Sequence, residues 1–299
     1  MGKRKGSGYG LVLISAVLWG MLPIFTRKLY GNGWSPQVVS AMRAYLGAVI
    51  TLVTLILNGT LSRFRVKDIP FYLLYGTLGI SGCFLAYGIS IQMNSTAVAA
   101  VLLYTGPAFV NIFERIFYKK RLTWVKILSL IITFAGCAMV VGLYDLSTVT
   151  DNLLGIVVGL LSGICYSMTT VIGEKAKEKY PGSVNGRLIL LFGAFAFLFV
   201  APPWNMPVFG GGDWLLFVCL AVFGSVLPYT CYLAGIDFGV EGGVASIVAT
   251  LEPVMAIVFG VTLLGDSLEW PQILGIAVVI AGVVLPILHS DCRKKETIV

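Results

Sequence analysis

The sequence predicts an all-α polytopic membrane protein, with ten transmembrane helices in two inverted five-helix repeats and both termini in the cytoplasm. The observations behind this prediction are an apolar composition, charge-free segments of bilayer length, and an internal repeat. Of the 299 residues, 58% are hydrophobic and only 12% are charged, whereas soluble domains carry about 25% charged residues. So few charges cannot cover a water-exposed surface. This composition excludes a secreted disulfide scaffold, a disordered chain and a soluble enzyme.

The transmembrane segments are marked by long stretches without Asp, Glu, Lys or Arg. A membrane helix needs about 20 mostly apolar residues. The longest charge-free stretch, 69–113, accommodates two helices, and two other segments are each interrupted by a single charge, Arg43 or Glu252. The expected spans are 9–29, 36–57, 70–91, 96–118, 123–143, 152–173, 187–203, 214–235, 243–264 and 270–289.

The distribution of basic residues predicts the orientation of these spans. Lys and Arg in short loops stay on the cytoplasmic side. With a cytoplasmic amino terminus, all 21 Lys and Arg residues fall on the inner side except Arg27, Lys28 and Arg43. Both termini are therefore expected in the cytoplasm. The net charge of +7 is explained by topology and requires no nucleic-acid partner.

An internal repeat divides the chain into a first unit, 1–146, and a second unit, 147–299. An offset of about 146 positions aligns Pro107 with Pro253 and several neighbouring apolar residues with one another. Each unit has five expected helices, an odd number, so the second unit crosses the membrane in the opposite sense.

A change of loop charge supports the inverted arrangement. The segment Lys119–Arg121 is basic and expected inside, whereas its counterpart Gly265–Ser267 contains Asp266 and is expected outside. A repeated unit that reverses its orientation is expected to reverse the charge of this loop, because basic loops are retained in the cytoplasm.

Pro107 and Pro253 are expected to kink the fourth and ninth spans. Proline removes a backbone hydrogen bond and leaves carbonyl groups for neighbours, water or substrate. Matched interruptions in two repeats are typical of a binding site near the membrane midplane, although two packing kinks without a ligand explain the same residues.

Two charged residues within spans are candidates for substrate contact or ion coupling. A charge near the bilayer centre costs about 2.5–3.5 kcal/mol, so Glu252 is expected to be protonated, to pair with a basic group, or to face a cationic part of a substrate. Arg43 is its candidate counter-ion, or a partner for a substrate carboxylate, or a structural arginine that snorkels outward.

Several aromatic and amide side chains are expected to line a substrate pathway. Trp19 and Tyr166 occupy matched positions in the first and sixth spans, and Asn111 follows Tyr104 by seven residues on one helix face. Tyr and Trp offer both a π face and a polar group to a zwitterionic or cationic solute. With Glu252, these four residues form the predicted substrate site.

Enzymatic and metal functions find little support in the sequence. The single histidine, His289, ends the last span, which excludes a histidine-based triad or a multi-histidine metal site. A P-loop of the form G-x-x-x-x-G-K-[ST] is absent from the sequence. We expect neither a catalytic residue nor a bound metal or cofactor.

The segments Ser15–Met21, Leu102–Pro107, Thr250–Val254 and Gly265–Gly275 resemble the drug/metabolite transporter (DMT) superfamily and its EamA-type family over essentially the whole chain. This resemblance implies a secondary transporter with a cavity between two five-helix halves. One departure is Asp266, where the family more often has Glu; the charge is kept.

The expected function is therefore export of a small polar metabolite, an amino acid or related compound, across the cytoplasmic membrane by alternating access. A proton or other ion gradient would drive it, and the protein would be a monomer or homodimer. The alternatives are efflux of lipophilic or organic cations, transport of a nucleotide- or sugar-type metabolite, or a non-transporting membrane scaffold.

Overall fold

A computed structural model describes residues 2–94, 96–143 and 152–296 of the chain. Every regular element in these ranges is helical, as the composition predicts. Nine of the helical segments are long and apolar enough to cross a membrane. Within the described ranges they are Gly6–Gly31, Pro36–Leu57, Val66–Met93, Thr96–Tyr118, Leu153–Ala176, Gly182–Val200, Gly211–Asp237, Gly242–Leu264 and Trp270–His289.

Most of these segments consist of consecutive helical pieces. In chain order the pieces are α1 (Gly2–Gly20), α2 (Leu22–Gly31), α3 (Pro36–Leu57), η1 (Leu61–Arg63), η2 (Val66–Asp68), α4 (Ile69–Gly76), η3 (Thr77–Gly82), α5 (Cys83–Met93), α6 (Thr96–Leu103), α7 (Gly106–Tyr118), α8 (Trp124–Val140), α9 (Leu153–Ala176), α10 (Gly182–Val200), η5 (Pro203–Asn205), α11 (Gly211–Ala221), η6 (Val222–Val226), α12 (Leu227–Asp237), α13 (Gly242–Ala249), α14 (Glu252–Phe259), η7 (Gly260–Leu264) and α15 (Trp270–Glu296).

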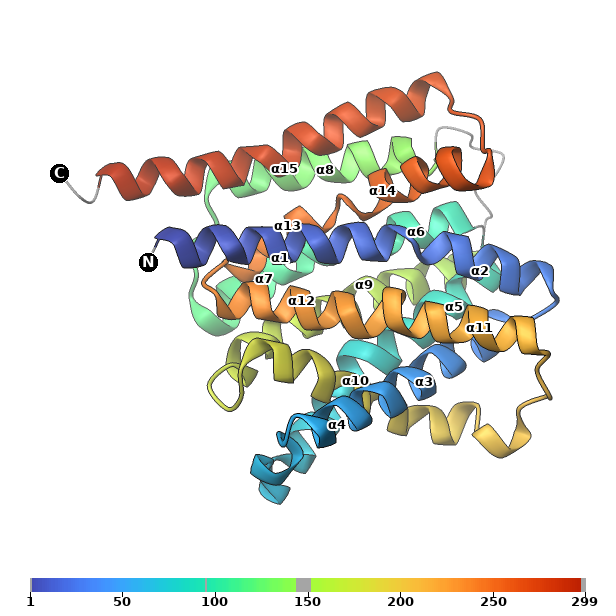
Figure 1. Cartoon of the computed structure of the whole chain (residues 1–299). Helices are drawn as coiled ribbons and strands as arrows, with labels where there is room; N and C mark the ends of the chain where they lie inside the picture. Colours follow the sequence, from blue (N-terminus) through green and yellow to red (C-terminus); the bar gives the residue numbers. More distant parts are fainter. Residues whose placement is uncertain (1, 95, 144–151, 297–299) are drawn as a thin grey trace.

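The expected span 123–143 holds α8, a shorter apolar helix of 17 residues. At 1.5 Å per residue this helix is about 25 Å long, slightly less than the hydrocarbon core of a bilayer, which is about 30 Å thick. Helix α8 packs along α15, and the two run side by side in Figure 1. The structure thus contains nine long candidate spans in its described part, with α8 as a shorter tenth candidate.

Helix interruptions occur at equivalent places along the chain. Tyr104 and Thr105 separate α6 from α7, and Thr250 and Leu251 separate α13 from α14, at a spacing of 146 positions. A proline occupies the first turn of the helix that follows each break. Proline there has no N–H to give to the preceding turn, so the regular hydrogen-bond ladder is interrupted at both sites.

The described residues contain three π-helical turns, η3, η6 and η7, and the first two of them occupy equivalent places. One turn, η3, lies between α4 and α5, and the other, η6, lies between α11 and α12. The starts of the two turns, at Thr77 and Val222, are 145 positions apart. π-Helical turns are rare and occur frequently at functional sites.

The closest helix neighbours come from opposite halves of the chain. Helix α1 packs against α12, α3 against α10, α5 against α9, and α8 against α15; these helices interleave in Figure 1. Glycines permit the closest approaches: a Cβ added at Gly76 of α4 would lie 2.4 Å from the backbone nitrogen of Gly193 in α10.

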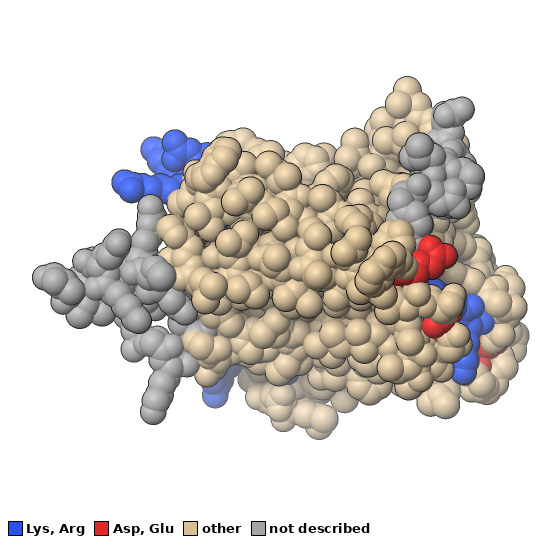
Figure 2. Space-filling model, turned by 90° about the horizontal axis from the view of Figure 1, so that it is seen from above, with Lys and Arg blue, Asp and Glu red and all other residues tan. Residues whose placement is uncertain are grey.

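The two ends of the bundle differ in the connections that they carry. The start of α1 and the end of α15 lie at the same end of the molecule, and the connections from α2 to α3 and from η7 to α15 lie at the other (Figure 1). Figure 2 shows a broad uncharged surface, with charged side chains gathered toward its two ends. Exposed apolar residues such as Ile131 (60%) and Leu288 (60%) suit contact with lipid. The chain is accordingly a multi-pass membrane protein.

Candidate functional site

A cavity of about 700 Å³ lies between helices of both halves of the chain. Its lining begins near the connections that follow α2 and η7 and extends inward to the helix breaks at Tyr104 and Leu251. Thr96 and Ala100 of α6 line it, whereas no residue of α7 does so. Because α7 continues α6 toward the end of the bundle where α1 starts, the cavity is open at one end and closed at the other.

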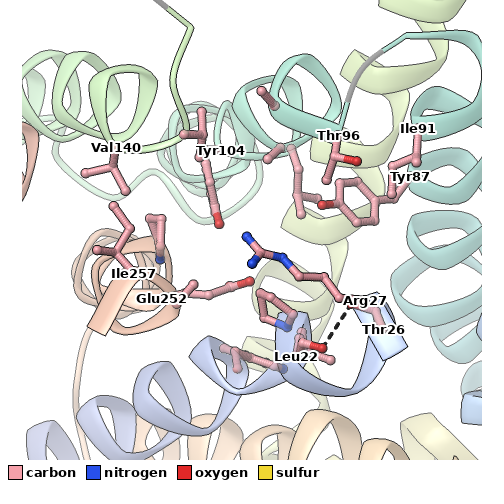
Figure 3. A pocket seen from close by; sticks show the side chains of 18 of the residues that line it. Leu22, Thr26, Arg27, Tyr87, Ile91, Thr96, Tyr104, Val140, Glu252 and Ile257 are labelled. Atoms are coloured by element: carbon pink, nitrogen blue, oxygen red, sulfur yellow. Dashed lines mark hydrogen bonds between the residues drawn. The ribbon is translucent and has the colours of Figure 1, made fainter. Parts of the chain in front are cut away.

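The structure brings most of the predicted site residues to this one cavity. Trp19, Arg43, Tyr104, Tyr166 and Glu252 all line it. In Figure 3 the side chains of Tyr104 and Glu252 point into the same pocket from two different helical segments. Positions far apart in the sequence therefore form one site, in which a carboxyl group, a guanidinium group and several aromatic rings face the same space.

Asn111 is the predicted binding residue that lies outside the cavity. Its side chain is 3% exposed, and its Nδ2 donates hydrogen bonds to the carbonyl oxygens of Pro107 at 2.9 Å and Gly243 at 3.3 Å. The seven-residue spacing from Tyr104 spans the helix break, so the two side chains do not share one continuous helix face. Asn111 instead ties α7 to α13.

The two prolines occupy different surroundings. Pro253 lines the main cavity, whereas Pro107 lies beside a separate void of about 10 Å³ that also touches Tyr104, Tyr166 and Glu252. The two repeats thus share a helix break at the matched prolines, but only Pro253 faces the main cavity.

Arg43 is fixed by contacts with two other spans. Its Nε donates a 2.6 Å hydrogen bond to Oγ of Ser225, and its Nη2 donates a 2.5 Å hydrogen bond to the carbonyl oxygen of Gly224. The guanidinium carbon lies 4.0 Å from the ring centroid of Phe84, a cation–π geometry. These contacts hold the guanidinium group between spans without an ion pair to Glu252 in the described part of the chain.

Glu252 is the first residue of α14 and lies in the same cavity as Arg43. The start of a helix favours a carboxylate because unpaired N–H groups point toward it. Among the described residues no ion pair joins Glu252 to Arg43 or to any other basic side chain. Two opposite charges therefore face one cavity without neutralising each other through direct contact.

Aromatic rings form the inner wall of the cavity. The ring of Trp19 packs edge to face against the rings of Tyr229 and Tyr166, with centroid distances of 5.2 Å and 6.5 Å. The centroid of the Tyr232 ring lies 5.6 Å from that of Trp19. Trp19 is only 3% exposed. Such packing is worth about 0.5–1.5 kcal/mol per ring pair beyond the burial of area and gives the inner wall a fixed shape.

An exposed ion pair lies at the open end of the cavity. Nη1 of Arg27 is 2.5 Å from Oδ2 of Asp266, and the two side chains are 58% and 39% exposed. Ion pairs this accessible contribute about 0–1 kcal/mol, so the pair can separate at little cost. Asp266 and Arg27 of α2 thus contact each other, and both line the open end of the cavity.

A buried ion network lies at the closed end. Nζ of Lys120 is 2.7 Å from Oε1 of Glu114 in α7 and 2.8 Å from Oε1 of Glu174 in α9. Oε2 of Glu114 accepts a 3.0 Å hydrogen bond from the backbone N–H of Gly243. Burial disfavours the ammonium form of Lys120, but Glu114 and Glu174 outweigh that effect and raise its pKa.

The sequence did not indicate the partners of Arg43 or the buried network. Ser225 is an ordinary small residue in an apolar span, and Glu114 follows a charge-free stretch directly, so it resembles a helix-end residue. Ser81 and Ser225 lie in the equivalent π-helical turns η3 and η6, 144 positions apart, which only the structure reveals.

The helical bundle and its internal cavity, lined by charged and aromatic residues, define a membrane transporter class. The model of the EamA-like transporter family matches residues 6–142 and 153–288, and the chain belongs to this family, within the DMT superfamily.

Full-length relatives carry transporter descriptions. The chain is similar to an "Uncharacterized transporter" of Clostridium kluyveri (26% identity over 300 residues, 96% of this chain and 94% of the relative). It is also similar to the "Uncharacterized inner membrane transporter YicL" of Salmonella typhimurium (22% over 290 residues, 95% and 96%). A crystal structure described only as that of a protein has the same fold, with a TM-score of 0.82 at 15% identity, covering 96% of this chain and 99% of the other. The family and its relatives point to transport rather than catalysis.

Proposed function

We propose that the protein moves a small zwitterionic metabolite, an amino acid or related compound, across the cytoplasmic membrane. The observation that carries this proposal is that Arg43 and Glu252 line one cavity, each with part of its charge left for a ligand. An α-amino acid carries a carboxylate and an ammonium group, which are complementary to these two side chains.

The aromatic residues support the same class of substrate. Trp19, Tyr104 and Tyr166 line the cavity and offer apolar faces to a side chain and π faces to an ammonium group. The residues that we propose contact the substrate are thus Trp19, Arg43, Tyr104, Tyr166 and Glu252. Asn111 has no part in this set, because backbone carbonyls hold its amide.

We infer that transport proceeds by alternating access between two inverted halves, with export as the expected direction. The breaks at 104–105 and 250–251, the two π-helical turns, and the interleaved packing of the halves support an inverted repeat. By the distribution of basic residues the cavity opens toward the outside and is closed toward the cytoplasm by the Glu114, Lys120 and Glu174 network.

The test is counterflow in liposomes that contain the purified protein. A panel of amino acids, their decarboxylated amines and organic cations would be offered with and without an imposed pH gradient. We expect counterflow of at least one amino acid but not of its amine. Absence of counterflow for every amino acid would refute the proposal.

Two variants separate the zwitterion proposal from efflux of organic cations. Both functions need the carboxylate of Glu252, so Glu252→Gln should reduce transport in either case, by about tenfold or more. Only the zwitterion proposal needs the guanidinium group, so Arg43→Gln should reduce amino-acid transport and leave cation transport unchanged or increased. Glu178→Gln, at an exposed position, is the matched control and should transport as the wild type does.

A further inference from the structure

The guanidinium group of Arg43 is held by one of its two edges. The bonds from Nε to Ser225 and from Nη2 to Gly224 occupy the side edge, and Phe84 lies against the flat face. A guanidinium group has five N–H donors in a planar fork. Nη1 and the second hydrogen of Nη2 form the end edge, which has no hydrogen-bond acceptor among the described residues. In a planar guanidinium group this edge faces a different direction from the edge that is bound to η6, and Arg43 is among the residues that line the cavity.

The π-helical turn η6 supplies both acceptors. Its wider hydrogen-bond pattern departs from the regular i to i−4 pairing, so its carbonyl groups are more available to donors from other helices. Gly224 and Ser225 are consecutive residues of this turn. The turn therefore presents a backbone carbonyl and a hydroxyl oxygen at the spacing of the side edge of the guanidinium group.

The equivalent turn in the first half makes a different contact. Ser81 of η3 donates its hydroxyl to the carbonyl oxygen of Gly193 in α10, and α10 is the counterpart of α3 by the 146-residue offset. Gly193 corresponds to Gly47 of α3, and a Cβ at Gly47 would lie 4.0 Å from Cβ of Ser225. Ser81 thus joins two helices directly, whereas Ser225 accepts a hydrogen bond from a cavity side chain.

We propose that Ser225, together with the carbonyl of Gly224, is a positioning element that aims the free edge of Arg43 at a substrate carboxylate. A carboxylate matches the end edge with two parallel hydrogen bonds. A dianionic phosphate fits less well, because Glu252 places a negative charge in the same cavity, and the second guanidinium group in the lining, that of Arg27, is already paired with Asp266. The inference deepens the proposed function by naming what recognises the anionic end of the substrate.

The primary test does not depend on transport. The purified full-length protein is treated with phenylglyoxal, which modifies accessible arginines, and modification of Arg43 is followed by peptide mass spectrometry. Propionate, propionamide and methylphosphonate are the probes, and exposed Arg63 is the internal reference. We expect propionate to protect Arg43 and not Arg63, propionamide to protect neither, and methylphosphonate to protect Arg43 less than propionate does.

Variants then test the role of Ser225. Ser225→Ala should weaken protection of Arg43 by propionate about tenfold, because one hydrogen bond to a charged group is lost. Ser225→Thr retains the hydroxyl group and should preserve protection, and Ser81→Ala, the matched serine of η3, should leave it unchanged. Equal protection in wild type and Ser225→Ala, or equal loss in Ser225→Ala and Ser81→Ala, would overturn the positioning role.

The outcomes separate this inference from the proposed function. Failure of propionate to protect wild-type Arg43, or stronger protection by methylphosphonate, overturns the carboxylate subsite even if Ser225→Ala does not fold. If an amino acid is transported, Ser225→Ala should raise its KM about tenfold with little change in maximal rate, while Ser225→Thr and Ser81→Ala leave its KM unchanged. Absence of amino-acid transport combined with propionate protection would refute the proposed substrate and leave the subsite standing.

Discussion

The backbone N–H of Gly243 donates a 3.0 Å hydrogen bond to Oε2 of Glu114, which joins the start of α13 to α7 at the closed end of the cavity. The other carboxylate oxygen of Glu114 pairs with Lys120 at 2.7 Å. Glu114 is 1% exposed, so its carboxylate is surrounded by protein. The closed end therefore depends on one buried acidic residue that contacts both halves of the chain.

Replacing Glu114 should destabilise the protein. Glu114→Ala leaves the Gly243 N–H without its acceptor and removes one of the two partners of Lys120, which we expect to cost about 1–3 kcal/mol. Thermal unfolding of the purified protein in detergent measures the effect. Glu178→Ala, at an exposed acidic position four residues beyond Glu174, should leave the midpoint unchanged. Equal shifts in both variants would contradict the assignment.

The stability that Lys120 contributes should depend on pH at the alkaline end. Glu114 and Glu174 raise the pKa of Lys120 in the folded protein, so its contribution is fully present below the unfolded pKa of about 10.4 and is lost as the pH rises through the higher folded pKa. The difference in unfolding midpoint between wild type and Lys120→Met should stay constant from about pH 7 to 9 and shrink above about pH 10.4. A difference that grows with rising pH would contradict the pairing.

Two tyrosine variants should separate binding from stability. Tyr104 lines the cavity, and its hydroxyl has no protein partner among the described residues. Tyr104→Phe should therefore change the free energy of unfolding by less than about 0.5 kcal/mol, and it should weaken substrate binding. The hydroxyl of Tyr75 is buried and donates to the carbonyl of Thr169 at 2.6 Å, so Tyr75→Phe should cost about 1–3 kcal/mol and leave KM unchanged. Unfolding midpoints and counterflow kinetics of both variants test whether Tyr104→Phe affects binding alone and Tyr75→Phe affects stability alone.

Close backbone contact between α4 and α10 predicts a strong effect at Gly76. A Cβ there would lie 2.4 Å from the nitrogen of Gly193 and 2.8 Å from the carbonyl oxygen of Ile189; because both atoms belong to the backbone, the helices must separate. Gly76→Ala should therefore destabilise by about 1–3 kcal/mol. Gly10→Ala in α1, where no atom lies within 4 Å of the new Cβ, should be neutral to slightly stabilising. Similar losses in expression and unfolding midpoint for both would argue against this packing.

Reporter fusions test the expected orientation. A fluorescent protein that matures only in the cytoplasm, fused after residue 299, should be fluorescent, and alkaline phosphatase, active only outside, should be active when inserted in segment 144–151, which lies outside the described residues. The physical reason is that five crossings separate this segment from a cytoplasmic amino terminus. An active phosphatase at the carboxyl terminus would show that the chain crosses the membrane an odd number of times. That outcome would fit the nine long spans without α8.

The expected spans agree closely with the helical segments that the structure describes, because charge-free length is a direct consequence of the bilayer as solvent. The agreement is poorest for the span 123–143, where the helix α8 has only 17 residues. Local signals also placed Arg43, Glu252 and the aromatic residues among the candidates, since a charge or a Tyr in an apolar span stands out. The seven-residue spacing between Tyr104 and Asn111 predicted that both would line the cavity. A helix break separates the two residues, and helical spacing holds only within an unbroken helix, so Asn111 lies outside the cavity.

Composition and local sequence pattern were enough to identify the lipid bilayer as the environment of this protein, the approximate limits of its helices and the small set of intramembrane charges. Each of these follows from composition and local periodicity. Long-range packing decides which of those residues share a cavity. It also brings Arg43 to Ser225, 182 positions away, instead of to Glu252, and it places Glu114 and Lys120 at the closed end of the cavity. The contacts of Arg43 with Ser225 and of Glu114 with Gly243 join helices from opposite halves of the chain. Helix packing in a membrane is set by the fit of small residues and polar partners, which local sequence does not specify.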